Sequence, residues 1–265
     1  MSPHPGHLVT QNRQITLITG GSRGIGRAIA GEFAAHGHAL GLVARDTAAL
    51  EAAASELNRD YGVTVRTYAL DLTSADAAAR LRAAISADGL TVKYLVNNVG
   101  YWSLGSLAAT DINDLGRVVA TNVLLPLHLI KAFLPQVIAA GGGILNVGSL
   151  AGSLPTPTFA AYGASKSFLA ALSVAMRHEL KVQRIKVCVV QPGLVRTDFV
   201  RLNAMSLWYR MCASSPETVA RVAYRGLLSG RSIVVPGMLT RILSFSIACL
   251  PRGITQGIFN AAAPG

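Results

Sequence analysis

Two residues that can move a proton stand four positions apart, at Tyr162 and Lys166. On a helix, side chains at this spacing project from one face about one turn apart, so the two groups can act together. A free tyrosine hydroxyl has a pKa near 10, so acid–base work near pH 7 needs that pKa lowered by about three, roughly 4 kcal/mol, by positive charge. The Lys166 ammonium can supply part of that charge. The pair therefore indicates general acid–base catalysis, although each residue alone would more often be an interface tyrosine or a solvated lysine.

A glycine-rich segment, TGGSRGIG at residues 19–26, lies between the first apolar run and the first helical pattern. Glycines at a strand-to-helix junction let the backbone approach a pyrophosphate above the positive N-terminus of the helix. Gly20, Gly24 and Gly26 have a G-x-x-x-G-x-G spacing, which differs from the common G-x-G-x-x-G fingerprint. Elsewhere such a cluster would be an ordinary turn, but at this junction it indicates a nucleotide site.

Short apolar runs alternate with alanine-rich helical patterns along most of the chain. This order predicts an α/β fold, a doubly wound parallel sheet of Rossmann type with helices on both faces. Because no repeat or linker interrupts it, we expect one domain over residues 1–265, with a loose lead-in at 1–12 and a C-terminal extension at 238–265. The expected strands cover residues 15–18, 39–43, 63–70, 94–96, 143–147, 185–191 and 232–235, and the expected helices cover 25–35, 47–61, 74–87, 112–140, 159–182 and 216–229.

Further motifs follow the glycine turn in a fixed order. They are Asp71-Leu72 after the third strand, NNVG at 97–100 after the fourth, Asn122 in the next helix, Ser149, YGASK at 162–166, and Pro192-Gly193 with Thr197. In these motifs the chain resembles the short-chain dehydrogenase/reductase family from residue 15 to about 237. NNVG differs from the family's usual NNAG by one apolar side chain.

The resemblance implies hydride exchange between a nicotinamide and a carbonyl or alcohol. In that family pattern Tyr162 exchanges a proton with the substrate oxygen, Ser149 hydrogen-bonds the same oxygen, and Lys166 also holds the nicotinamide ribose. Asn122 then positions a water that links Lys166 to solvent. The implied cofactor-binding residues are Gly20, Ser22, Arg23, Gly24, Ile25, Gly26, Arg45, Asp71, Leu72, Asn98, Gly100, Tyr162, Lys166, Pro192, Gly193, Val195 and Thr197, and no metal is expected.

The end of the second strand indicates which nicotinamide is used. By resemblance, an acidic residue there favours NAD and a basic residue favours the 2'-phosphate of NADP. This strand ends Val43-Ala44-Arg45-Asp46, and Arg23 in the glycine turn offers a second guanidinium. Two forked cations suit a phosphate dianion, so we expect NADP(H). The alternative is that Asp46 caps the next helix while Arg45 lies on the surface, and both descriptions can hold together.

The composition indicates which partners and which cellular compartment to expect for the protein. The 265 residues are 51% apolar and 14% charged, and the net charge of +11 concentrates toward the C-terminus. No lysine-rich run with interleaved aromatics is present, so we expect no nucleic-acid partner. The three cysteines, Cys188, Cys212 and Cys249, are widely spaced, and residues 1–12 do not form a signal-peptide pattern, so we expect a cytoplasmic protein. The apolar segment at residues 242–250 is too short to cross a bilayer. In order of preference, we expect it to form a packing helix, an oligomer contact or an interfacial anchor.

The loops at the carboxyl ends of the strands are expected to form the substrate pocket. Their larger side chains are mostly apolar: Tyr101, Trp102, Leu154, Phe159, Leu202, Met205, Leu207, Trp208 and Met211. This predicts an apolar carbonyl or alcohol substrate, and it leaves open a 3-oxoacyl thioester on an acidic carrier, a steroid, an aliphatic ketone and an aromatic carbonyl. We expect residues 197–214 to act as a lid over the substrate. The alternative is that the apolar residues of this segment only pack the helix of the lid.

Other functions and assemblies compete with this interpretation. One alternative is a non-catalytic NADPH-sensing regulatory protein, and another is a membrane-surface-associated reductase of lipid or steroid substrates. By resemblance we expect a homo-oligomer, a dimer or tetramer, paired through the helices that follow the fourth and fifth strands. The apolar surface expected there comes from Phe168, Leu169, Leu172, Val174 and Ala175.

Overall fold

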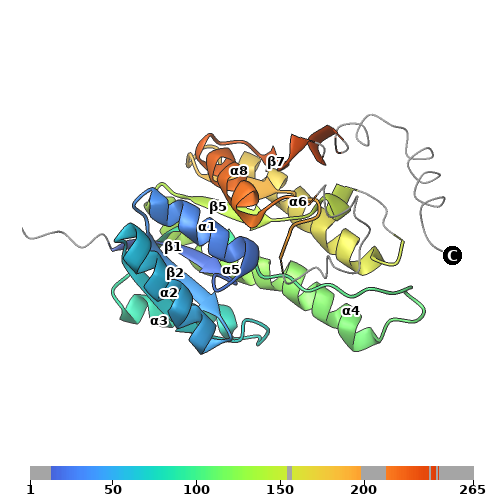
Figure 1. The fold of residues 1–265 in the computed structure, drawn as a ribbon, viewed down its shortest axis with the longest axis horizontal. Helices are drawn as coiled ribbons and strands as arrows, with labels where there is room; N and C mark the ends of the chain where they lie inside the picture. The colour runs from blue at the N-terminus through green and yellow to red at the C-terminus, as the bar shows by residue number, and fades with distance from the viewer. Residues whose placement is uncertain (1–12, 154–156, 198–212, 239, 243, 245–265) are drawn as a thin grey trace, which may run out of the picture.

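The computed structural model describes residues 13–153, 157–197, 213–238, 240–242 and 244. In this part of the chain seven parallel strands form one sheet with the order β3-β2-β1-β4-β5-β6-β7 (Figure 1). The strands are β1 (Gln14–Thr19), β2 (Ala39–Ala44), β3 (Val65–Ala69), β4 (Thr91–Asn97), β5 (Gly143–Val147), β6 (Lys186–Val190) and β7 (Ile233–Val234). The expected doubly wound parallel sheet is therefore confirmed.

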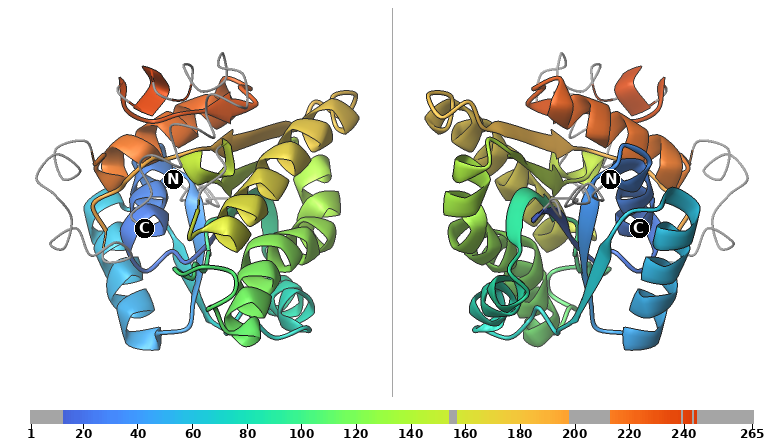
Figure 2. Two further views of the ribbon diagram at one scale, coloured as in Figure 1. Left: turned by 90° about the vertical axis from the view of Figure 1, so that its right-hand side faces the viewer. Right: turned by 90° about the vertical axis from the view of Figure 1, so that its left-hand side faces the viewer.

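Helices cover both faces of the sheet because the central strands are apolar on both sides (Figure 2). Ile18 faces the layer that contains α1, α2 and α8, whereas Leu17 next to it faces the layer that contains α3, α5 and α6. The helices of the first layer are α1 (Gly24–Ala35), α2 (Thr47–Tyr61) and α8 (Pro216–Leu228). Those of the second layer are α3 (Ala77–Ala87), α5 (Leu125–Ala139) and α6 (Ala160–Glu179).

Several predicted helix boundaries are confirmed by their caps. The Asp46 carboxylate accepts a hydrogen bond from the Ala49 backbone N–H at 3.1 Å, so Asp46 does cap α2. Ser215 caps α8 in the same way, through the Thr218 N–H at 3.2 Å.

The helix expected from residue 74 begins later, at Ala77. The Asp71 carboxylate accepts hydrogen bonds from the backbone N–H and the hydroxyl of Thr73, and the Ser74 hydroxyl donates to the Asp71 carbonyl. These local bonds compete with helix formation and hold the segment in turns.

The long helix expected over residues 112–140 contains a break at the site. It consists of α4 (Ile112–Val119), a π-helical turn η1 (Ala120–Leu124) and α5. Pro126 has no N–H to donate to the carbonyl of Asn122 four residues earlier, so the regular α-helical bond cannot form there. The combined run is long and apolar enough to span a membrane, but Phe133 and Val137 lie in the core against the sheet. It therefore forms a packed layer of the fold.

One expected surface residue on α6 lies in the interior. Leu169 is only 2% exposed, whereas its neighbour Phe168 is 37% exposed. Adjacent residues on a helix point about 100° apart, so the two side chains cannot both face outward. The prediction that Leu169 offers apolar surface was wrong, and Leu172 also packs partly against the core.

The order of the strands produces a crevice at the carboxyl end of β1. β2 and β4 pair with opposite edges of β1, so the connections that leave β1 and β4 run to opposite sides of the sheet. Ligands in open α/β sheets bind at such a point. Gly20 N–H donates to the Val43 carbonyl at 2.7 Å, and the Asn98 amide donates to the Thr19 carbonyl at 2.9 Å. These bonds tie the loop after β1 to the end of β2 and the loop after β4 to the end of β1.

Candidate active site

Tyr162 and Lys166 lie on the first turns of α6, and Ser149 lies just beyond β5. The Lys166 ammonium is 5.7 Å from the centre of the Tyr162 ring and donates a hydrogen bond to the Val147 carbonyl at 3.0 Å. Lys166 is buried, at 4% exposure. The fold therefore brings together the pair that the sequence placed on one helical face, and it adds Ser149.

Burial dominates the electrostatics of the pair. Burial raises the pKa of Tyr162, and its hydrogen bond with Ser149 acts in the opposite direction without cancelling that effect. Burial lowers the pKa of Lys166 to about 8. The expected depression of the Tyr162 pKa is thus not produced by the protein groups alone, because Lys166 directs its ammonium to a carbonyl. Tyr162 is a neutral phenol near pH 7, the form that can donate a proton.

Asn122, in the π-helical turn, is 1% exposed, and its side-chain oxygen and nitrogen are both hydrogen-bonded. Its side-chain oxygen accepts from the Tyr101 N–H at 2.8 Å, and its amide group donates to the Tyr101 carbonyl at 2.8 Å and to the Ser165 hydroxyl at 2.9 Å. A Cβ added at Gly100 would lie 3.4 Å from the Lys166 ammonium and 3.5 Å from the Asn122 oxygen. The loop after β4 therefore lies directly against both residues.

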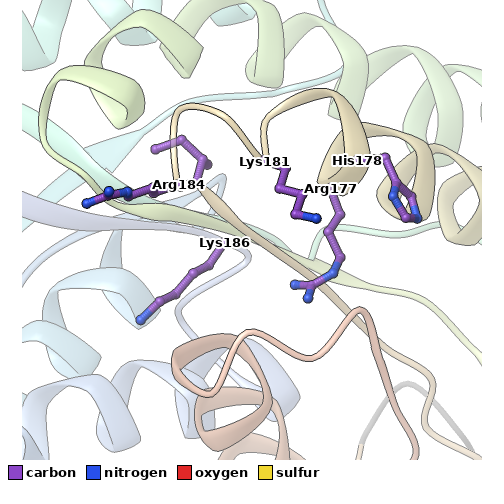
Figure 3. A pocket seen from close by; sticks show the side chains of 6 residues that line it. Arg177, His178, Lys181, Arg184 and Lys186 are labelled. Atoms are coloured by element: carbon purple, nitrogen blue, oxygen red, sulfur yellow. The ribbon is translucent and has the colours of Figure 1, made fainter.

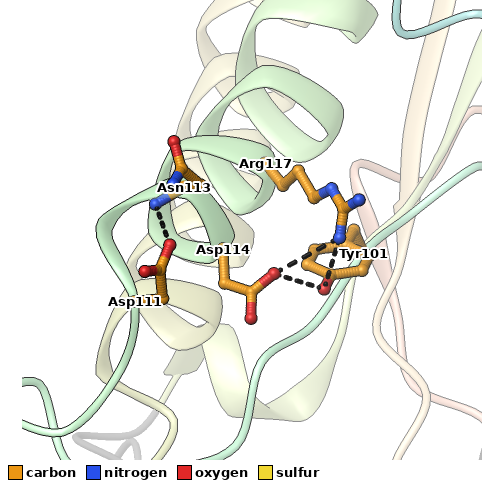
Figure 4. A network of polar contacts seen from close by, with 5 residues as sticks. All are labelled: Tyr101, Asp111, Asn113, Asp114 and Arg117. Atoms are coloured by element: carbon orange, nitrogen blue, oxygen red, sulfur yellow. Dashed lines mark hydrogen bonds and ion pairs between the residues drawn. The ribbon is translucent and has the colours of Figure 1, made fainter.

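Three residues hold this loop from the outside (Figure 4). The Tyr101 hydroxyl donates to the Asp114 carboxylate at 2.9 Å, and the Arg117 guanidinium donates to both at 3.3 Å. The guanidinium also lies 5.3 Å from the centre of the Tyr101 ring. Tyr101 was expected as a pocket wall, but Asp114 and Arg117 were missed. Their i,i+3 spacing on a helix is the signal that could have paired them, whereas Tyr101 could not be placed beside them from the sequence.

The glycine turn between β1 and α1 has the close packing that a phosphate cradle requires. Gly20 and Gly24 adopt positive φ angles of 66° and 57°, which favour glycine. A Cβ at Gly26 would overlap the Gly20 carbonyl oxygen, and one at Gly24 would touch Thr197 at 3.4 Å. The glycines therefore leave room for the backbone to approach a ligand at the start of α1, and Ser22 and Ile25 lie in the same turn. This fits a bound pyrophosphate.

Arg23 and Arg45 are exposed at this same edge of the sheet. Arg23 precedes α1, and Arg45 follows β2, which pairs with β1 in parallel. Among the described residues, neither guanidinium forms an ion pair. Two cations that form no ion pair in the described part of the chain therefore lie at the same edge of the sheet as the glycine turn.

The remaining expected cofactor residues differ in how far their side chains are available to a ligand. Asp71 turns its carboxylate onto Thr73, whose hydrogen bonds lower the pKa of that carboxyl, and Leu72 is buried in the core. Val195 is also a core side chain, so only its backbone is available to a ligand. Asn98, Pro192 and Gly193 lie in the loops after β4 and β6. Their roles toward a cofactor stay predictions.

The described part of the expected substrate wall is aromatic. Trp102 stacks on Phe159 with ring centres 5.7 Å apart, and Phe159 meets the Tyr162 ring edge-on at 6.3 Å. The Gly105 N–H donates to the Thr158 carbonyl at 3.0 Å, which ties the two loops together. The other expected wall residues, Leu154, Leu202, Met205, Leu207, Trp208 and Met211, lie outside the described residues, as does most of the expected lid.

Comparison with protein families and curated proteins gives a consistent result. Residues 14–206 match the family model of the short chain dehydrogenase. The very-long-chain 3-oxoacyl-CoA reductase of Laccaria bicolor is 34% identical over 174 residues, which are 64% of this chain and 52% of that protein. This chain thus aligns with about half the length of that relative. The putative oxidoreductase SadH of Mycobacterium tuberculosis is 30% identical over 85% of this chain and 86% of its own. Sulfoacetaldehyde reductase of Chromohalobacter salexigens is 38% identical over 69% of this chain and 73% of its own.

Solved structures share the same architecture. A short-chain dehydrogenase from Sphingobium yanoikuyae in complex with NADPH superposes with a TM-score of 0.78 at 28% identity, covering 93% of this chain and 95% of that one. An alcohol dehydrogenase from Thermococcus sibiricus complexed with 5-hydroxy-NADP superposes with a TM-score of 0.75 at 26% identity, covering 84% and 95%.

Proposed function

The chain belongs to the short-chain dehydrogenase/reductase family of oxidoreductases, and we propose that it interconverts an apolar carbonyl compound and its secondary alcohol with NADP(H). The observation that carries this proposal is the grouping of Ser149, Tyr162 and Lys166 at the carboxyl end of β5, beside the glycine turn. Each of these residues alone has an ordinary structural explanation. Their grouping at the crevice where such sheets bind ligands supports chemistry.

In the reductive direction NADPH supplies the hydride, and the chain's own residues manage the proton. Tyr162, a neutral phenol because burial raises its pKa, donates a proton to the substrate oxygen. Ser149 hydrogen-bonds the same oxygen. Lys166, whose pKa burial lowers to about 8, is mostly protonated at pH 7. Its ammonium donates to the Val147 carbonyl in this structure, and we propose that it turns toward Tyr162 to stabilise the phenolate left there. Asn122 holds the Tyr101 backbone and Ser165 against this pair and is proposed to position the water that resupplies the proton.

Replacement of Tyr162 by phenylalanine tests the acid. We expect turnover to fall by about two to four orders of magnitude while the dissociation constant for NADPH changes little, because the phenol transfers a proton and contributes little binding. Tyr61→Phe is the matched control, since Tyr61 is 45% exposed on α2. Full turnover by the Tyr162→Phe variant would refute the mechanism. A wild-type protein that binds NADPH and reduces no carbonyl in a broad panel would favour the NADPH-sensing alternative.

The preference for NADP(H) is proposed from Arg23 and Arg45, the two exposed cations at the crevice edge. Hydrogen bonds to a charged group contribute about 1.5–3 kcal/mol, so Arg45→Ala should weaken NADPH binding by about tenfold or more. Binding of NADH should change less than twofold, because NADH lacks the phosphate. Arg66→Ala, which removes an exposed arginine from β3, is the control. Equal effects on both nucleotides in a fluorescence titration would contradict the assignment.

An apolar substrate is proposed because the described wall beside Tyr162 consists of Trp102 and Phe159. Long-chain 3-oxoacyl thioesters are the first substrates to test, since several relatives carry that activity in their names. Steroids and simple ketones fit the same wall. NADPH oxidation measured side by side on 3-oxoacyl thioesters, steroids, aliphatic ketones and sulfoacetaldehyde decides among them. A profile restricted to sulfoacetaldehyde would contradict an apolar pocket.

We also propose a homo-oligomer in the cytoplasm. Apolar side chains remain exposed on α4, η1 and α6, among them Ile112, Val119, Leu124 and Phe168. Burying these groups against a second copy would remove them from water. Light scattering after size exclusion should give a mass of two or four subunits. A monomer at micromolar concentration would contradict this proposal.

A further inference from the structure

A group of basic side chains lies at the corner where α6 ends and β6 begins (Figure 3). Arg177, Lys181, Arg184 and Lys186, which we call the basic edge, line an open cavity of about 280 Å³ together with His178 and Ile185. Residues 177–186 contain these four cations and one carboxylate, Glu179, a net charge of 4 − 1 = +3 with histidine neutral. These ten residues therefore carry more than a quarter of the net charge of +11.

The four cations of the basic edge form no ion pairs within the part of the chain that the structure describes. Among the described residues the ion pairs involve Arg27, Arg59, Arg80 and Arg117, and none includes a residue of the basic edge. The carboxyl end of α6 presents roughly half a negative charge, which is far less than the four cations carry. Like charges repel one another, so an anion bound among these cations would be stabilised.

The basic edge does not serve the reaction. Tyr162 is near the beginning of α6 and Arg177 near its end, 15 residues apart in the numbering. At about 1.5 Å per residue the two are about 22 Å apart along the helix. Lys186 starts β6 at the amino edge of the sheet, whereas Ser149 and the glycine turn lie at the carboxyl edge. A ligand at the basic edge is therefore at the opposite end of the strands from the candidate active site.

One arginine of the basic edge occupies a backbone conformation that favours glycine. Arg184 has a φ of 58°, in the left-handed region, and its N–H donates to the Lys181 carbonyl at 3.0 Å to close the turn. Glycine or asparagine fits such a position better than arginine does. The chain thus keeps a cation at a position where its backbone is strained, which suggests that the guanidinium itself is needed.

The shape of the basic edge fits an extended surface better than a single small anion. Figure 3 shows the labelled side chains fanning out from the turn, with Arg184 pointing away from Arg177 and His178. Val182, between Lys181 and Arg184 in the chain, is 89% exposed. Cations spread around an exposed apolar side chain match the headgroup region of a bilayer, where phosphates and the first apolar atoms lie at neighbouring depths.

We propose that the basic edge is a docking surface for an anionic lipid bilayer, with the lipid phosphates bound by its four cations and Val182 reaching the interfacial layer. This contact goes beyond the proposed oxidoreductase function and does not depend on it. It also lies on a different part of the chain from the C-terminal extension at 238–265. The carboxyl edge of the sheet, which holds the candidate active site, then faces away from the membrane.

Vesicle co-sedimentation of the full chain tests this docking surface. We expect binding to phosphatidylcholine vesicles that contain about 30% phosphatidylglycerol and no binding to pure phosphatidylcholine. Raising the salt from about 0.1 M to about 0.5 M should release the protein, because exposed charges are screened. Equal binding to both kinds of vesicle would overturn the proposal.

The decisive variant is Lys181→Ala/Arg184→Gly, compared with Arg66→Ala/Arg82→Ala as a control of equal charge change on exposed residues of β3 and α3. Each cation near an anionic surface contributes about 1 kcal/mol, a factor of about five, so the first variant should bind vesicles about 25-fold more weakly. The control should change binding less than twofold. Because Arg184→Gly relieves the positive φ, the melting temperature should not fall, and turnover of a soluble substrate should be unchanged. An equal loss of vesicle binding in both variants would show that only net charge matters, and it would overturn the proposal. Unchanged vesicle binding by Lys181→Ala/Arg184→Gly would also overturn it.

Discussion

The buried Lys166 should cost the protein stability at neutral pH, and its replacement by methionine makes that cost measurable. Burial lowers the pKa of Lys166 from 10.5 to about 8, so its charged form is disfavoured by about 3 kcal/mol in the folded state. Methionine removes this cost. It also removes the hydrogen bond to the Val147 carbonyl, a loss of about 1–2 kcal/mol. Lys166→Met should therefore raise the free energy of unfolding by about 1–2 kcal/mol at pH 7 while abolishing turnover.

The pH dependence distinguishes this reasoning from a simple packing effect. Between pH 8 and 10.5 the unfolded chain binds more protons at Lys166 than the folded protein, so wild-type stability rises with pH across that window. Near pH 10 the lowered pKa of Lys166 should destabilise the folded protein by less than about 1 kcal/mol, so Lys166→Met should then be no more stable than wild type. Urea unfolding at pH 7 and pH 10 measures both values, with Lys131→Met, an exposed lysine on α5, as the control. A Lys166→Met protein less stable than wild type at pH 7, or a difference that does not vary with pH, would refute the argument.

Three further outcomes are expected. The rate of NADPH-dependent reduction should decline as the pH passes about 8, where Lys166 loses its proton, and a kcat/KM profile that stays flat to pH 10 would contradict this. Gly26→Ala should weaken NADPH binding at least about tenfold, because its Cβ overlaps backbone in the glycine turn, whereas Gly116→Ala, which meets nothing within 4 Å, should leave binding unchanged in a fluorescence titration. Asp114→Ala should release the Tyr101 side chain and lower kcat about tenfold with an unchanged NADPH dissociation constant, and unaltered kcat would show that this network is only structural.

The sequence alone determined the order of elements and most of their boundaries. α2 and β5 have the predicted bounds, 47–61 and 143–147, because apolar periodicity and caps such as Asp46 act over a few neighbouring residues. The grouping of Tyr162 and Lys166 was also predictable, since both lie on one helix. The family was identified from motifs that occur in order, and the match of residues 14–206 confirms it.

Features that depend on distant contacts were decided by the tertiary structure. Asn122 bonds to Tyr101 and Ser165, which are 21 and 43 residues away in the chain, and no local pattern specifies such partners. The direction of the Tyr162 pKa shift depends on how much chain covers it and on the carbonyl that Lys166 contacts instead. The basic edge likewise arises where the end of α6 meets the start of β6, although the sequence drew attention to the C-terminal arginines. Burial and long-range hydrogen bonds are properties of the folded chain, so they set the chemistry of residues whose types and order the sequence had already specified.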